Sequence, residues 1–234
     1  MNERVRLFGV VTTLAAYALA LRVHRKITWL HPLLLTCLLL MAMLLLLPYL
    51  RIPLTVEDYS RGGDLIVFFL GPSTVALAVP LYKHRRTLGR HVAQIAVSIV
   101  AGGLVGIFSA AAIAMALHAT RAIVLSVMSK SVTTPIAVEI TRALGGKPEL
   151  TAAIVVCAGL LGAVVGVPVL KAIGLKNNAA IGLGMGTASH GIGTSSVLRT
   201  SELQGTYAGL AMALNGIFTA TLLTPLAPWI ARLL

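Results

Sequence analysis

The sequence predicts an all-α protein that crosses a membrane several times, and three observations carry this prediction. Of the 234 residues, 57% are hydrophobic and only 11% are charged. The mean hydropathy is +0.92. A soluble domain carries roughly 25% charged residues, so this chain has too little charge for a surface that faces water. Third, seven stretches contain no charged residue, and most are as long as the roughly 20 residues that a bilayer span requires.

The charge-free stretches define the predicted membrane segments, which are residues 7–21, 27–50, 65–82, 92–117, 150–170, 177–198 and 203–231. An eighth segment, at about 121–144, is interrupted by Lys130 and Glu139. We therefore expect seven to eight membrane segments, some of them discontinuous helices. Loops one and three are rich in Lys and Arg, which places them in the cytoplasm. If one interrupted segment dips into the membrane and returns, every loop after it changes sides.

The net charge of +12 does not indicate a nucleic-acid partner. The cations lie in short clusters between apolar runs, such as residues 22–26 and 83–90, rather than on one face with aromatic residues. Cys37 and Cys157 lie inside apolar runs, so they indicate neither a metal site nor a redox function. No cofactor is expected. The first apolar stretch resembles a signal peptide, but the cations directly after it favour a retained membrane segment.

A short repeat suggests that residues 1–234, which we expect to form one integral membrane domain, have two halves. Residues 106–110 read Gly-Ile-Phe-Ser-Ala, and residues 216–220 read Gly-Ile-Phe-Thr-Ala. Each copy lies in a long span that follows a glycine-containing, broken segment. Many transporters are built from internal repeats with discontinuous helices. The halves would be about 1–118 and 119–234, although five small and apolar residues can also match by chance.

The first broken segment contains Gly71, Pro72, Ser73 and Thr74. Proline removes a backbone donor and interrupts helical hydrogen bonding, and in lipid the freed carbonyl groups need another partner. Ser73 and Thr74 can supply that partner in a kinked helix. The alternative is a pair of half-helices that meet at a cavity.

The second broken segment, residues 129–135, combines a cation with hydroxyl groups in an apolar environment. Thr134 and Pro135 predict the N-cap and the first residue of a helix that stops at Gly145. A helix that starts at membrane depth presents unpaired N–H groups, and Lys130, Ser131 and Thr133 lie beside it. This arrangement favours a bound carboxylate or another small anion. The alternative is an exposed turn whose lysine extends to the lipid headgroups.

The third broken segment, residues 182–196, is rich in glycine and polar residues and cannot face lipid as a regular helix. Its candidate substrate-binding residues are Ser189, His190 and Thr194, and its predicted breaks are Gly186, Gly191 and Gly193. His190 titrates in a range that suits proton coupling. The alternative is a neutral histidine that donates to a carbonyl and fixes helix packing.

No enzyme is expected, and no catalytic residue is assigned. Ser189 and His190 are adjacent, but no acidic residue lies near them in the sequence to complete a hydrolase site. Asn215 lies in the middle of a span and is interpreted as a bridge between helices. Glu139 and Arg142 are three residues apart and are expected to pair along one helix face.

Three long stretches resemble the signature motifs of the LrgB/CidB family: residues 70–82, 130–137 and 186–194. The resemblance covers nearly the whole chain in order. The usual form of the family has alanine where this chain has Ser73 and Gly191, and both are small substitutes. The resemblance implies one of two activities. Bacterial members are described as antiholin-like proteins that act with a smaller LrgA-type membrane protein on murein hydrolase activity. The plastid relative is a glycolate/glycerate translocator, and some bacterial pairs are linked to pyruvate uptake.

Of the two activities that the resemblance implies, the residues favour transport, and we expect a secondary transporter of small monocarboxylates that is coupled to protons. The resemblance implies the bacterial inner membrane as its location and an LrgA-type protein as its partner. Lys130, Ser131, Thr133 and Thr134 would hold the carboxylate, Ser73 and Thr74 would contribute from the first break, and Ser189, His190 and Thr194 would line the opposite wall. We also expect an oligomer. The alternatives are a regulator of lysis without transport, and a structural scaffold for the partner.

Overall fold

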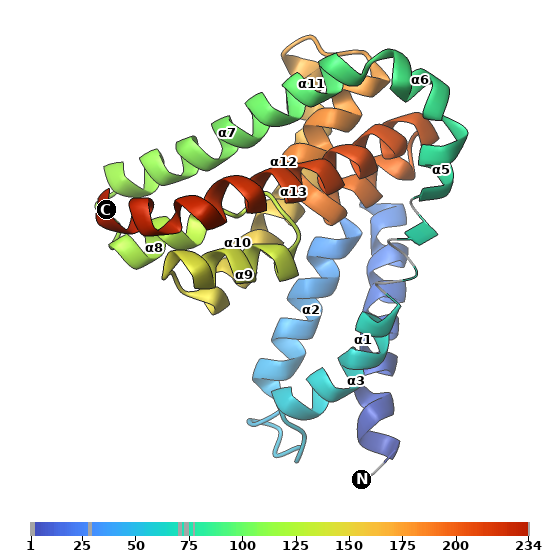
Figure 1. Cartoon of the computed structure of the whole chain (residues 1–234). Helices are drawn as coiled ribbons and strands as arrows, with labels where there is room; N and C mark the ends of the chain where they lie inside the picture. The colour runs from blue at the N-terminus through green and yellow to red at the C-terminus, as the bar shows by residue number, and fades with distance from the viewer. Residues whose placement is uncertain (1–2, 28–29, 70–71, 73–74, 77, 234) are drawn as a thin grey trace. The chain divides into compact units, whose positions relative to one another are not determined.

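The computed structural model describes residues 3–27, 30–69, 72, 75–76 and 78–233, and all of its regular elements are helices (Figure 1). The chain divides into two compact units, Met1–Ala76 and Leu77–Leu234. Four helical stretches are long and apolar enough to cross a membrane: Leu7–Lys26, Val92–Ala116, Pro148–Ala172 and Glu202–Ile230. The chain is therefore a multi-pass membrane protein, as the composition predicts.

The first unit is built from α1 (Glu3–Lys26), α2 (Pro32–Leu46) and α3 (Val56–Phe68), and α1 packs against both others. Thr13 Oγ1 and Tyr59 Oη are 2.8 Å apart and join α1 to α3. At the start of α3, the backbone N–H of Thr55 donates to Asp58 Oδ2 (3.0 Å) and the N–H of Asp58 donates to Thr55 Oγ1 (3.2 Å). This reciprocal cap fixes the start of the helix. Thr55 Oγ1 also donates to Asp58 Oδ2 (2.9 Å), and the two hydrogen bonds that this carboxylate accepts from Thr55 lower the pKa of the Asp58 carboxyl group.

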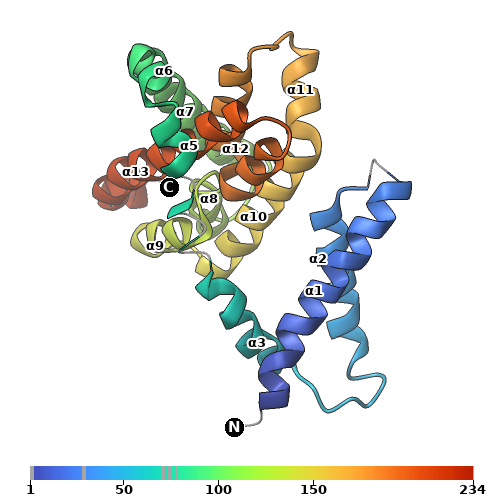
Figure 2. The same cartoon turned by 90° about the vertical axis from the view of Figure 1, so that its right-hand side faces the viewer.

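The second unit contains the long helices α7 (Val92–Ala116) and α13 (Glu202–Leu233), which run side by side (Figures 1 and 2). They run in the same direction (Figure 1), because Ile95 and Tyr207, early in each helix, share one cluster, and farther along a Cβ on Gly103 would lie 2.7 Å from Asn215 Oδ1. The remaining elements are α5 (Ala78–Lys83), α6 (Arg85–Arg90), α8 (Arg121–Val127), α9 (Thr134–Leu144), α10 (Pro148–Leu161), the π-helical turn η1 (Gly162–Gly166), α11 (Val167–Ala172) and α12 (Asn178–Leu198).

The predicted segment at 121–144 does not cross as one helix, because α8 and α9 form a hairpin that we call hairpin A (residues 121–144). Ser129 Oγ donates to the carbonyl of Ala137 (3.2 Å) and lies 3.1 Å from Thr141 Oγ1. Near the other end, the N–H of Lys147 donates to Ser126 Oγ (2.8 Å). Residues early in the segment thus pair with residues late in it, as only a chain reversal allows. The tip of hairpin A is residues 128–133.

The segment at 177–198 is also folded back on itself, and we call it hairpin B (residues 178–198). Its helical geometry breaks at Ser189 (φ −128°, ψ 16°) and His190 (φ 40°, ψ −137°). Ile181 and Met185, before the break, pack in one cluster with Val197, after it. Both ends of α12 reach the start of α13. Gln204 Nε2 donates to Asn178 Oδ1 (2.8 Å), and a Cβ on Gly205 would lie 2.7 Å from Leu198 Cβ. A straight helix of this length would separate those ends by about 30 Å.

The count of eight crossing segments is not confirmed. A hairpin at 121–144 moves the loops at 145–149 and 171–176 to the other side, as in the alternative prediction, and the second reversal at 178–198 restores the predicted side of the loop at 199–202. The five-residue repeat places Gly106 on α7 and Gly216 on the neighbouring α13. Whether the halves are a true repeat stays a prediction.

Candidate functional site

The tip of hairpin A and the tip of hairpin B, which is residues 187–190, meet at one buried side chain, Asn215 of α13. Its Nδ2 donates to the carbonyl of Ser131 in hairpin A (3.4 Å) and to the carbonyl of Thr187 in hairpin B (3.1 Å). Asn215 is 1% exposed. Both carbonyls lie at or beside a helix break, where no helical N–H is available to them. One amide therefore donates to one backbone carbonyl in each tip, and the predicted role of Asn215 as a bridge is confirmed.

Three glycines on α7 allow the tips to approach this closely. A Cβ on Gly102 would lie 3.0 Å from Thr187 Cγ2, and one on Gly103 would lie 2.7 Å from Asn215 Oδ1. A Cβ on Gly106 would lie 3.4 Å from Ser131 Oγ. These glycines are in the middle of a 25-residue helix. Since such a helix spans the bilayer, the meeting point of the tips lies near the middle of the membrane.

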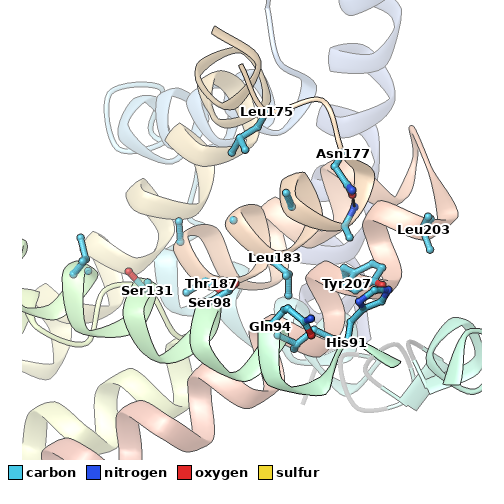
Figure 3. A pocket seen from close by; sticks show the side chains of 18 of the residues that line it. His91, Gln94, Ser98, Ser131, Leu175, Asn177, Leu183, Thr187, Leu203 and Tyr207 are labelled. Atoms are coloured by element: carbon cyan, nitrogen blue, oxygen red, sulfur yellow. Dashed lines mark hydrogen bonds between the residues drawn. The ribbon is translucent and has the colours of Figure 1, made fainter. Parts of the chain in front are cut away.

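A cavity of about 820 Å³ extends from the tips between α7 and the first half of α12 (Figure 3). Lys130 and Ser131 line it from hairpin A, and Thr187 and Ala188 line it from hairpin B. The residues that line it include no Asp or Glu. The cavity therefore carries a positive charge without a carboxylate to neutralise it.

Lys130 is the cation that the geometry singles out. It is half-buried, and its Nζ donates to Ser131 Oγ (3.2 Å). Among the described residues, no ion pair includes Lys130. The helix α9 begins directly after the tip, so its positive dipole end faces the same region. A lysine at membrane depth is costly unless it has a partner, and a small anion in this cavity would supply one.

The structure shifts the start of α9 by one residue relative to the prediction. Thr133 is the N-cap with extended geometry (φ −62°, ψ 146°), and Thr134 is the first helical residue. Helix ends read from sequence are uncertain by one or two residues, because the capping residue is defined by backbone geometry. The predicted stop is confirmed, since Gly145 has left-handed geometry (φ 81°). The Glu139–Arg142 pair is also present, at 2.6 Å.

The structure brings only part of the predicted site together. Lys130 and Ser131 line the cavity, whereas Thr133 and Thr134 are half-buried at the tip of hairpin A without lining it, and Pro135 is exposed. Gly71, Ser73 and Thr74 lie outside the described residues, and Pro72 is an exposed helical residue. Whether any of these residues binds substrate stays a prediction.

The second predicted wall is buried in protein behind the cavity. Ser189, His190 and Thr194 do not line the cavity. His190 is 4% exposed, its Nε2 lies 2.9 Å from the carbonyl of Val155, and its own carbonyl accepts from Thr194 Oγ1 (2.7 Å). These are the contacts expected of the structural alternative, a histidine that fixes packing. Its positive φ costs about 1–3 kcal/mol in a residue other than glycine, so the surrounding contacts must hold it there.

Glycines along α10 and η1 make room for this break. A Cβ on Gly159 would lie 2.7 Å from His190 Cε1, and one on Gly162 would overlap Ser189 Oγ. The π-helical turn Gly162–Gly166 lies opposite the break. Such turns occur mostly as single insertions in α-helices, frequently at functional sites. Of the predicted breaks in hairpin B, Gly186 packs directly on the Ala208 carbonyl of α13, Gly193 lies against Met185, and Gly191 lies near Met212.

The sequence interpretation missed the cavity residues of α7. Gln94 and Ser98 line the cavity, and Thr187 joins them from hairpin B. A signal for them was present, because Gln94 and Ser98 are polar, four residues apart and therefore on one face of an apolar span. Nothing local in the sequence showed which helix that face meets.

Replacing Asn215 with alanine is expected to lower the free energy of unfolding by about 1–3 kcal/mol, because two carbonyls at the tips lose their buried donor. The measurement is thermal unfolding of the purified protein in detergent. Leu214→Ala is the control, since Leu214 is 38% exposed on the same helix and makes no polar contact between the tips. Equal melting temperatures of the two variants would contradict the bridging role.

Comparison with known proteins finds relatives along almost the whole chain. Residues 13–229 match the LrgB-like family. An uncharacterized protein of Haemophilus influenzae is 37% identical over 240 residues, which cover 100% of this chain and 98% of the relative. The uncharacterized protein YwbG of Bacillus subtilis is 36% identical over 218 residues, covering 90% of this chain and 94% of the relative.

A third relative carries a functional name. The antiholin-like protein LrgB of Bacillus subtilis is 32% identical over 213 residues, which cover 91% of each chain. No solved structure gives a significant match. The family match spans most of the chain, and these relatives share more than 30% identity over nearly their full lengths. The resemblance seen in the sequence is thus confirmed, and the chain belongs to the LrgB-like family.

Proposed function

We propose that this protein is a secondary transporter of small monocarboxylates such as pyruvate, glycolate or glycerate. The observation that carries the proposal is Lys130 at the meeting point of two hairpin tips, in a cavity whose lining residues include no acidic side chain. A pore-forming or purely structural protein has no need for an uncompensated lysine at membrane depth.

The chemistry of the tips suits a carboxylate. The ammonium group of Lys130 supplies charge, the hydroxyl of Ser131 supplies a hydrogen-bond donor, and the positive dipole end of α9, which begins directly after the tip, adds to the positive field. Thr187 adds a hydroxyl from hairpin B. Discontinuous helices at the midplane are a common way for transporters to form a site that two membrane faces can reach in turn. The discontinuous hairpins A and B fit this pattern.

We propose that transport is coupled to protons. We also propose that the protein lies in the bacterial inner membrane and that its partner is an LrgA-type membrane protein. His190 remains the candidate proton carrier of the sequence hypothesis, although its contacts fit a packing role. The coupling is tested by an imposed pH gradient, and the partner by its inclusion or omission.

A second candidate function is regulation of murein hydrolase activity without transport. The observation that favours it is the name of the relative in Bacillus subtilis, antiholin-like protein LrgB. A regulator of this kind would act only in cells that have a wall, whereas a carrier works in pure lipid.

The test is uptake of labelled pyruvate, glycolate and glycerate into proteoliposomes, with and without an LrgA-type partner and with and without a pH gradient. Saturable uptake of at least one substrate is the expected result. If no substrate moves although the folded protein and its partner are both present, the regulatory function becomes the better explanation.

A further inference from the structure

The cavity at the hairpin tips is elongated along α7. Its lining residues on this helix begin with His91, directly before the first helical residue, and end with Gly106, whose added Cβ would lie 3.4 Å from Ser131 Oγ in the tip of hairpin A. Fifteen residues of helix at about 1.5 Å each span about 22 Å. This is more than half of the roughly 30 Å thickness of the hydrocarbon core. The cavity therefore runs from one membrane face to the midplane.

The side of α7 that lines the cavity carries polar side chains beside the apolar Ile95 and Val105. Gln94 and Ser98 face the cavity and are exposed there. Val97 and Val100 lie on the other side of the same turns and are exposed but apolar. A glutamine that faces lipid would lack hydrogen-bond partners. Its position on the cavity side indicates that this side of α7 is solvated.

The outer end of the cavity lies at the basic face of the second unit. Thr87, His91 and Asn177 line this end, which brings the start of α7 and the start of α12 to the same membrane face. The start of α13 is there too, because Lys83 Nζ pairs with Glu202 Oε1 (3.2 Å). Seven Lys and Arg residues of the second unit fall at this face: Lys83, Arg85, Arg86, Arg90, Lys171, Lys176 and Arg199.

Four Lys and Arg residues of the second unit fall at the opposite face: Arg121, Arg142, Lys147 and Arg232. The excess of cations identifies the face with the cavity mouth as cytoplasmic. The same cations raise the local concentration of small anions at the mouth.

The inner end of the cavity is closed. Beyond Lys130 and Ser131, the next part of hairpin A and of α7 forms an apolar cluster in which Val132 and Ile107 are buried against Leu223 of α13. A continuous route through the second unit therefore stops at the tips.

We propose that the cavity is a water-filled half-channel through which small anions reach Lys130 from the cytoplasm, and that the structure is the state open to that side. The proposal rests on the proposed transport function for the identity of the anion. The route itself depends only on the geometry of α7, hairpin B and the cavity mouth.

The test is the reactivity of single cysteines towards an anionic, membrane-impermeant thiosulfonate reagent. Cys37 and Cys157 are first replaced by serine, and Ser98→Cys and Gln94→Cys are then introduced separately. Val97→Cys is the matched control, because it lies at the same depth on the same helix outside the cavity. Arg86→Cys reports the reactivity of an exposed residue of α6 at the face with the cavity mouth. Each variant is measured in inside-out and right-side-out vesicles.

We expect Ser98→Cys and Gln94→Cys to react from the cytoplasmic side at rates within about tenfold of Arg86→Cys, and at least about tenfold faster than Val97→Cys. Pyruvate at saturating concentration should slow the reaction at Ser98→Cys severalfold. The proposal is overturned if both cavity cysteines are as unreactive as Val97→Cys, or if they react only from the outer side.

The outcomes separate this proposal from the transport function. Labelling from the cytoplasmic side without uptake or protection by any carboxylate would support the half-channel and contradict transport. Uptake in proteoliposomes with unreactive cavity cysteines would support transport and contradict the half-channel. Comparable gel-filtration profiles show that the cysteine variants are folded.

Discussion

Replacing Lys130 with alanine is expected to reduce carboxylate uptake about 10- to 100-fold. A hydrogen bond between charged partners contributes about 1.5–3 kcal/mol, which corresponds to this range of affinity. The loss should appear mainly as a higher KM, because the ammonium group holds the substrate in its bound state. The measurement is initial uptake into proteoliposomes over a range of substrate concentrations.

Two variants make the Lys130 prediction specific. Lys130→Arg keeps the charge and should retain part of the uptake, although the larger guanidinium group does not reproduce the compact ammonium. Lys147→Ala removes an exposed lysine between α9 and α10 and should leave uptake within about twofold of wild type. Unchanged uptake in Lys130→Ala would contradict the proposed anion site and favour the interpretation of the protein as a scaffold.

The largest expected effect on stability is at Gly186. A Cβ there would overlap the carbonyl oxygen of Ala208 and lie 2.7 Å from Ala208 Cα, so hairpin B would have to move away from α13. Because backbone cannot rotate aside as a side chain can, we expect Gly186→Ala to lower the free energy of unfolding by about 1–3 kcal/mol or more. Thermal unfolding in detergent measures the change.

Gly184→Ala is the matched control for Gly186→Ala. Gly184 lies two residues away on the same helix, and its added Cβ would meet only side-chain atoms of Leu170, at 3.3 and 3.4 Å. Both substitutions increase helix propensity equally, so this term cancels in the comparison. If the two variants have the same melting temperature, the close approach of hairpin B to α13 in the structure is wrong.

Much of the fold could be predicted from the sequence, because a segment that faces lipid must be apolar and must satisfy its backbone hydrogen bonds internally. The apolar stretch at 92–117 predicted α7 almost to the residue, and Gly145 predicted the end of α9. The segments at 121–144 and 177–198 were recognised as interrupted, since Lys130 and the glycine-rich run around His190 cannot form lipid-facing helices.

The residues of an interrupted segment do not by themselves determine whether the segment crosses the membrane or turns back. The turn at Lys130–Thr133 is held by Ser129 with Thr141 and by Ser126 with Lys147, contacts between residues 12 and 21 positions apart. The turn at Ser189–His190 is held by Val155 of another helix. A hydroxyl in a membrane segment has many possible partners, and only the packed structure selects one.

Some features of the candidate site could also be predicted from the sequence, and others required the tertiary structure. The sequence by itself determined that the protein is helical and multi-pass, that it belongs to the LrgB-like family, and that Lys130 and Ser131 are exceptional at their depth. Only the tertiary structure decided that Asn215 joins the two tips, that Gln94, Ser98 and Thr187 line the cavity, and that Ser189 and His190 lie behind it. The physical reason is that transfer from water to lipid depends on each residue's own chemistry, whereas a cavity depends on which helix faces meet.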